Sequence, residues 1–290
     1  MTHMIRVVLL LGLAGSYALA TPAVAQDTAV TDSSAPASDV GSGLTIGLGG
    51  AYLPDYEGSD DYRLVPGPVA IGSVSGFSFT LAGNRLSVDM IPNKSGPTWD
   101  IQAGPIGVLN LNRTSRKSID NVRVKALDEL DMGIEAGGFV GIGKTGLITS
   151  DFDKLSVSIS YRKDVAGASK GSVWQPSINY LTPLSRKAAI ALFASAERVS
   201  DRYARYYFSV SPSDSLLSGL PAYSAEGGTK SYTLGALATV ALTGDLLHGA
   251  KLVAGGTYKR LQGNIADSPI VSIAGDRTQW LGAIGLAYTF

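Results

Sequence analysis

The sequence predicts an all-β protein: an antiparallel transmembrane β-barrel of about 12 strands that follows a cleaved signal peptide. Three observations support this fold class. The N-terminus is apolar and ends in a signal-peptidase pattern. Segments of roughly ten residues then repeat, each with alternating apolar and polar side chains. After the signal, no apolar run is long enough for a spanning helix.

The first 43 residues are predicted to be a targeting segment and a leader. Arg6 precedes an apolar run from Val7 to Ala20, and Ala23-Val24-Ala25 provides the small-x-small pattern of a cleavage site. An uncleaved membrane anchor is the alternative, but the run is short for a span of about 20 residues. We therefore assign residues 1–25 to a signal peptide, 26–43 to a flexible periplasmic leader and 44–290 to an outer-membrane barrel.

The alternation is clearest between Leu155 and Arg162, where Leu155, Val157, Ile159 and Tyr161 share one face and Ser156, Ser158, Ser160 and Arg162 share the other. A soluble sandwich would bury the apolar face, whereas a membrane barrel turns it to lipid. Small residues on the polar faces and aromatic residues at segment ends favour the membrane barrel. The last strand ends in Tyr288 and Phe290, which resembles the sorting signal of bacterial outer-membrane barrels.

Strands are predicted at 44–54, 64–73, 77–91, 99–111, 131–143, 155–165, 172–182, 188–198, 203–210, 231–242, 250–261 and 278–290. Two of these are ambiguous. Residues 77–91 change face at Gly83-Asn84, which is either a bulge or a tight hairpin, and 188–210 can be one long strand. If both alternatives hold, the count stays twelve, residues 112–130 lie outside and 183–187 form a periplasmic turn. We prefer that version because periplasmic turns are short.

The composition excludes several function classes. Twenty-four Lys and Arg balance 24 Asp and Glu, which argues against a nucleic-acid binder. The absence of Cys excludes disulfides, thiolate zinc sites and cysteine nucleophiles. After the signal the only histidine is His248, in a predicted turn, and no hydrolase or nucleotide-binding motif appears. We expect no enzyme activity and no cofactor.

Two groups of charged residues are candidates for binding or for structure. Asp55, Glu57, Asp60 and Asp61 lie in the first predicted external hairpin and are weak candidates for a divalent-cation site, although a solvated turn explains them equally. A second set is predicted to face the lumen and to form ion pairs there: Arg85, Asp89, Glu135, Arg162, Lys251 and Lys259.

Several motifs resemble the MipA/OmpV family (MltA-interacting protein) of outer-membrane proteins. They are the Tyr52-x-Pro-Asp-Tyr-Glu-Gly-Ser-Asp-Asp-Tyr-Arg63 segment with Pro66 and Pro68, Tyr207-Phe208-x-Val210, Gly219-Leu-Pro-Ala-Tyr223, Ser268-Pro-Ile-Val271 and Tyr288-Thr-Phe290. The resemblance spans about 52–290. It implies an outer-membrane β-barrel, with one branch acting as a scaffold between a murein hydrolase and a murein synthase and another treated as an antigen or adhesin. It implies no catalytic residues.

The leading functional hypothesis is a non-enzymatic envelope scaffold in the outer membrane. The expected partners are outer-membrane lipid, lipopolysaccharide and, through the family resemblance, murein hydrolase or synthase proteins. A small-solute channel is the second hypothesis, because small residues line the predicted lumen. An adhesin that uses loops 211–230 and 262–277 is the third.

Overall fold

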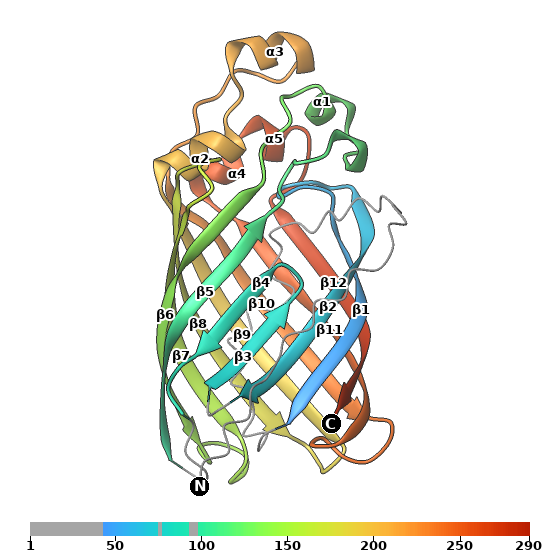
Figure 1. Ribbon diagram of the computed structural model, residues 1–290. Helices are drawn as coiled ribbons and strands as arrows, with labels where there is room; N and C mark the ends of the chain where they lie inside the picture. Colours follow the sequence, from blue (N-terminus) through green and yellow to red (C-terminus); the bar gives the residue numbers. More distant parts are fainter. Residues whose placement is uncertain (1–42, 75–76, 93–97) are drawn as a thin grey trace, which may run out of the picture.

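The computed structural model describes residues 43–74, 77–92 and 98–290, which form a closed antiparallel barrel (Figure 1). Each strand pairs with its neighbours in the sequence, and β1 closes the barrel against β12, from Thr45 opposite Thr289 to Tyr52 opposite Gly282. The predicted signal peptide lies outside the described residues, as does the predicted leader except for its last residue.

The strands are β1 (Leu44–Pro54), β2 (Tyr62–Val74), β3 (Phe77–Ala82), β4 (Arg85–Asp89), β5 (Trp99–Asn110), β6 (Gly133–Thr145), β7 (Lys154–Asp164), β8 (Ser172–Pro183), β9 (Ala188–Val199), β10 (Gly228–Ala241), β11 (Gly249–Leu261) and β12 (Thr278–Thr289). The predicted count of twelve is confirmed. The predicted strand at 203–210 is wrong, because α2 (Asp201–Phe208) occupies most of that segment.

The ambiguous segment at 77–91 is a hairpin. Gly83 adopts the left-handed conformation at φ 56°, and β3 and β4 pair across it, with Leu81 opposite Leu86 and Phe79 opposite Val88. Directly opposed residues lie on the same face of a sheet, so the change of apolar parity in the sequence follows from the turn. The hairpin also confirms the preferred sidedness, with 112–130 at the opposite end from the 183–187 turn.

The hairpin is short, and β2 therefore has a free edge. Strand β3 pairs with β2 only from Val69 to Val74, and the amide of Gly83 donates to the carbonyl of Pro68. The nitrogen of Pro68 faces the same edge as its carbonyl, and Pro66 has the same parity. Because proline has no N–H, these two residues leave no unpaired donor where the neighbouring strand is missing.

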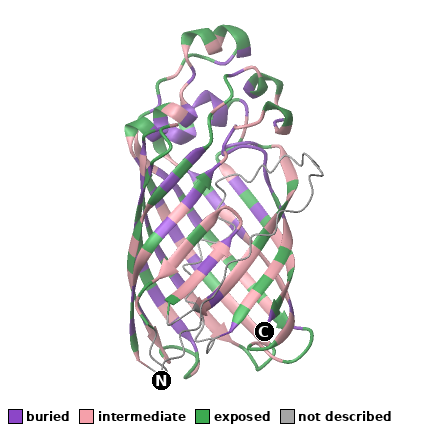
Figure 2. Cartoon of the chain, in the orientation of Figure 1, coloured by how far each residue is buried: buried purple, intermediate pink, exposed green. Residues whose placement is uncertain are grey.

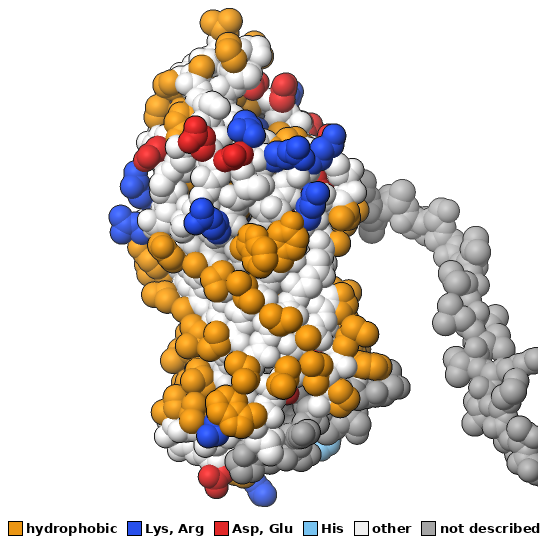
Figure 3. Space-filling model, turned by 90° about the vertical axis from the view of Figure 1, so that its left-hand side faces the viewer, with side chains coloured by type: hydrophobic (Ala, Val, Ile, Leu, Met, Phe, Trp, Pro, Cys, Tyr) orange, Lys and Arg blue, Asp and Glu red, His pale blue; other side chains and the backbone are white. Residues whose placement is uncertain are grey.

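The barrel wall separates an apolar outer face from a polar lumen. Leu48, Leu64, Leu234 and Ile284 are exposed outward, whereas Ser156, Gln175 and Asn179 are buried inward (Figure 2). Apolar side chains cover the wall below a level of charged ones in Figure 3. In the described part of the chain, no helix is both long and apolar enough to cross a membrane.

The long loops gather at one end of the barrel, which we call the external end, because such barrels have short periplasmic turns (Figure 1). They carry the short helices η1 (Arg116–Ser118), α1 (Val122–Lys125), α2, α3 (Pro212–Ser218), α4 (Gly263–Asp267) and α5 (Pro269–Ser272). Two buried apolar clusters hold these helices together; their members include Tyr207, Phe208, Ile265 and Val271 in one and Tyr56, Leu127, Leu220 and Ile270 in the other. We call this assembly the external cap.

Candidate functional site: an ionic cluster beneath the external cap

The acidic loop between β1 and β2 folds into the barrel mouth. The amide of Asp55 donates to the carbonyl of Asp61 at 3.0 Å, which closes the loop, and Gly58 within it has φ 104°. A Cβ at Gly58 would lie 2.6 Å from a methyl carbon of Val271, so the loop needs glycine for both its conformation and its packing. As a result Tyr56 and Glu57 are directed into the protein and are fully or almost fully buried.

Glu57 reaches an ionic cluster that crosses the lumen. Its carboxylate contacts the ammonium groups of Lys230 on β10, at 3.0 Å, and Lys259 on β11. Lys230 also contacts Glu197 on β9 at 2.8 Å. Arg162 on β7 joins Glu197, at 2.7 Å, to Glu135 on β6, at 2.6 Å. We define the ionic cluster as these three carboxylates and three cations: Glu57, Glu135, Glu197, Arg162, Lys230 and Lys259.

The electrostatics of the ionic cluster are balanced. All six side chains are at most 8% exposed, and the formal charges cancel. Burial raises the pKa of the Glu57 carboxyl, but Lys230 and Lys259 outweigh this effect and hold the pKa below its ordinary value of 4.5. A buried charge is tolerated only when it is paired, so each member depends on the others.

The acidic loop is also tied to the external cap. The Tyr56 hydroxyl donates to the carbonyl of Ala274, and the amide of Glu57 donates to Asn112 Oδ1 at 3.1 Å. The amide of Asp120 donates to Asp55 Oδ2 at 2.7 Å. The loops after β5 and β11 are therefore fastened to the same short segment that enters the ionic cluster, and the external mouth is closed by hydrogen bonds as well as apolar packing.

The four candidate cation ligands have different surroundings. Asp55 and Glu57 are buried and already have the partners described above, whereas Asp60 is exposed. Burial raises the pKa of Asp55, and the amide of Asp120 opposes that shift. No group of three or more His, Asp or Glu side chains suited to a metal ion occurs among the residues that the structure describes. Cation binding by this loop stays a prediction.

The predicted lumenal set pairs only in part. Arg162 and Glu135 bind each other as expected. Lys259 binds the acidic loop instead, Arg85 donates to Gln175 at 3.1 Å, Asp89 accepts backbone amides and Lys251 donates to the Thr289 hydroxyl. These last contacts correct the expectation that all six residues form ion pairs with one another.

Two central residues, Glu197 and Lys230, were missed by the sequence analysis. Glu197 lies on the polar face of a predicted strand. Lys230 has the parity of the outward Tyr232, so alternation places it toward lipid. A bulge between Thr229 and Ser231 turns both Lys230 and Ser231 inward. Only that irregularity brings the Lys230 ammonium to the carboxylates.

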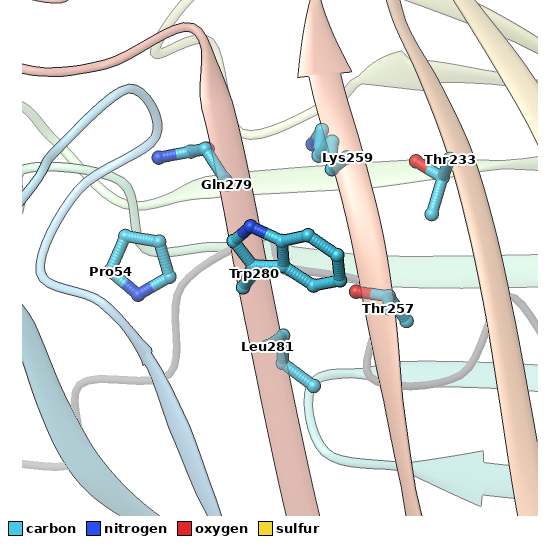
Figure 4. A pocket seen from close by; sticks show the side chains of 7 residues that line it. All are labelled: Pro54, Thr233, Thr257, Lys259, Gln279, Trp280 and Leu281. Atoms are coloured by element: carbon cyan, nitrogen blue, oxygen red, sulfur yellow. The ribbon is translucent and has the colours of Figure 1, made fainter.

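A small pocket lies beside the ionic cluster between β1, β10, β11 and β12 (Figure 4). Its lining residues are Pro54, Thr233, Thr257, Lys259, Gln279, Trp280 and Leu281. The only charged side chain among them, Lys259, is already bound to Glu57. The pocket therefore presents hydroxyl and amide groups but no acid–base pair of its own.

The two predicted sorting residues lie at the periplasmic end. Tyr288 and Phe290 are both exposed outward, with their rings 4.9 Å apart, and the amide of Phe290 donates to the carbonyl of Leu44 at 3.0 Å. Their role in membrane sorting stays a prediction. His248 is exposed in the β10–β11 turn, with Nδ1 3.7 Å from Asp245.

Comparison with known proteins identifies relatives at the family level. The family model described as "MltA-interacting protein MipA" matches residues 46–290. No curated protein matches the sequence. The solved structures of the outer membrane channel DcaP of Acinetobacter baumannii (10% identity, TM-score 0.37, 86% of this chain and 96% of that chain) and of the CymD monoaromatic hydrocarbon channel (10%, 0.38, 86% and 88%) are similar. At these TM-scores they carry no argument about function.

Proposed function

Because the chain belongs to the MltA-interacting protein (MipA) family and is an outer-membrane β-barrel, we propose that it is a non-enzymatic envelope scaffold. Its periplasmic end binds peptidoglycan-processing proteins, in the first place a murein hydrolase of the kind that the family description names. The closed external mouth is the observation that carries this proposal. A barrel whose lumen is crossed by the ionic cluster and covered by the external cap is suited to display surfaces rather than to conduct solutes.

The periplasmic turn between β6 and β7 supports a binding surface at that end. Asp153 accepts the amides of Leu147, Ile148 and Thr149 at 2.7, 2.9 and 2.5 Å, and the Tyr180 hydroxyl at 2.8 Å. Burial raises the pKa of Asp153, but these hydrogen bonds outweigh it and hold the pKa below its usual range. The carboxylate therefore stays charged and keeps the turn in one conformation.

This ordered turn presents apolar side chains to the periplasm. Ile148 is 63% exposed and Phe152 77% exposed, and Leu147 lies beside them. Exposed apolar side chains on a preorganised turn are typical anchors of a protein interface, because ordering the turn costs little when the partner binds. We propose that Ile148 and Phe152 are anchors for the murein hydrolase.

The test is a binding measurement between the purified full-length barrel, in nanodiscs, and the purified murein hydrolase MltA. The double variant Ile148→Ser/Phe152→Ser should weaken binding by about tenfold or more, since interface anchors contribute more than about 1 kcal/mol each. The matched control is Leu216→Ser/Leu217→Ser on α3, which removes two exposed apolar side chains at the external end. It should leave the affinity unchanged.

Other results would contradict the proposal. If the wild-type barrel does not bind the hydrolase, the scaffold function is wrong for this partner. If the α3 control weakens binding as much as the periplasmic variant does, the periplasmic end is not the interface. A steady ion conductance of the wild-type barrel in a planar bilayer would favour the channel hypothesis instead.

A further inference from the structure

A row of basic side chains faces outward near the external end. Lys163 on β7, Arg198 on β9 and Arg260 on β11 are all exposed. Lys163 and Arg260 lie two residues beyond Tyr161 and Tyr258, which stack with Trp174 and Trp280 at 4.6 and 4.9 Å. Figure 3 shows Lys and Arg side chains directly above the apolar belt on one side of the barrel. We call Lys163, Arg198 and Arg260 the basic row.

The register places the basic row at one level. Paired residues run perpendicular to strands tilted by about 35–45°, so each row climbs around the barrel. One row runs from Tyr161 through Trp174 to Arg198, and the next runs from Ala196 through Tyr232 to Arg260. Two strands of climb thus equal about two residues along a strand. The three cations lie level, about 10 Å apart on alternate strands.

The basic row is available to a ligand. None of its three side chains forms an ion pair with a residue that the structure describes. The two nearest carboxylates in the sequence, Asp164 and Asp201, are occupied by backbone amides: those of Ser169 and Lys170 at 2.7 and 2.8 Å, and that of Gly227 at 2.8 Å. Further cations extend the patch away from the membrane: Lys170, Arg202 and Arg205, all exposed.

The patch is confined to one side of the barrel. On the other side, the outward residues near the external ends of β1, β5 and β6 are Tyr52, Leu109 and Ile134, all exposed and uncharged. A general requirement for cations at the membrane surface would place them around the whole circumference. The one-sided arrangement indicates a bound molecule rather than a general interfacial preference.

We propose that the basic row binds the phosphate groups of lipid A, the phosphorylated glycolipid of the outer leaflet. Phosphates of this lipid lie just above the hydrocarbon layer, at the level next to the aromatic girdle. Arginine recognises phosphate through paired hydrogen bonds, and lysine binds it as a point charge. The acyl chains would pack on the apolar faces of β7 to β11 below, where Val157, Ile178 and Leu234 are exposed.

The experiment compares two double variants of the full-length barrel, each checked for folding by heat-modifiable gel migration. Lys163→Gln/Arg198→Gln removes two members of the basic row, and Arg186→Gln/Lys187→Gln removes two exposed cations at the periplasmic end. Binding of bisphosphorylated lipid A is measured by native mass spectrometry. Each cation at an anionic surface contributes about 1 kcal/mol, so the first variant should bind about 30-fold more weakly, and the control should bind like wild type.

A second probe tests the role of phosphate. Monophosphorylated lipid A with the same acyl chains should bind wild type more weakly than the bisphosphorylated form, and the Lys163→Gln/Arg198→Gln variant should lose most of that preference. Equal weakening in both double variants, or equal binding of the two lipids by wild type, would overturn the proposal. Binding of the murein hydrolase is read at the other end of the barrel, so failure there leaves this result unaffected.

Discussion

Glu57 and Lys230 are separated by 173 positions in the sequence, yet their charged groups meet at 3.0 Å inside the barrel. Glu57 belongs to a loop and Lys230 to the external end of a strand. Their contact links the external cap to the wall, and Lys259 and Glu197 complete the surrounding charges. The closed state of the mouth therefore depends on one buried carboxylate that enters from the loop.

Glu57→Gln should destabilise the barrel strongly. The amide keeps the shape of the side chain but removes its charge, which leaves Lys230 and Lys259 with less compensation. Breaking a buried ion pair on one side costs about 3–5 kcal/mol. Denaturant unfolding in detergent measures the loss. The control, Asp60→Asn in the same loop, removes an exposed charge and should stay within about 0.5 kcal/mol of wild type.

The same carboxylate should control conductance. Wild type is expected to show no steady current in planar bilayers, because the ionic cluster and the external cap obstruct the lumen. Deleting residues 55–61 should produce open-channel current. If wild type already conducts steadily, the mouth is not closed in the membrane, and the deletion would add nothing.

Acid should loosen the external cap. The pKa of Glu57 is lower in the folded protein than its ordinary value of 4.5, so the stabilisation is fully present above pH 4.5. It is lost as the pH falls through the folded-state pKa. Protease cleavage within 111–132, followed from pH 6 to pH 3 with an acid-active protease, measures the loosening. The pH dependence should be smaller in Glu57→Gln, and an equal dependence in both proteins would assign the effect to another group.

The lumen should tolerate added volume poorly at Gly235. A Cβ there would lie 2.1 Å from the ring of Phe193, whereas a Cβ at Gly282 would meet nothing within 4 Å. Overpacking of this kind costs about 1–3 kcal/mol. Gly235→Ala should therefore lower the unfolding free energy, and Gly282→Ala should leave it nearly unchanged. Equal effects of the two variants would mean that Phe193 moves aside freely.

Phe290→Ala should lower the amount of assembled barrel in the outer membrane, if the terminal residue is part of the sorting signal. The heat-modifiable fraction in membrane extracts measures assembly. The control is Leu286→Ala, which removes a lipid-exposed side chain from the same strand. A similar loss in both variants would indicate weaker lipid contact rather than impaired sorting.

Much of the fold follows from the sequence because it depends on local alternation. In a strand, neighbouring side chains point to opposite faces, so Val157 and Ile159 against Ser156 and Ser158 define the lipid and lumen sides without any knowledge of the partner strands. The change of parity at Gly83-Asn84 likewise contains the information that a turn lies there, although alternation alone left a bulge as the alternative.

Tertiary structure decided the rest. The segment at 203–210 has aromatic and apolar residues that suit a strand, but α2 packs its Tyr203, Tyr207 and Phe208 into the external cap. A bulge reversed the face of Lys230, and the acidic loop turned inward because charges on β9, β10 and β11 compensate Glu57. These outcomes rest on contacts between residues far apart in the chain, whose energies no local pattern encodes.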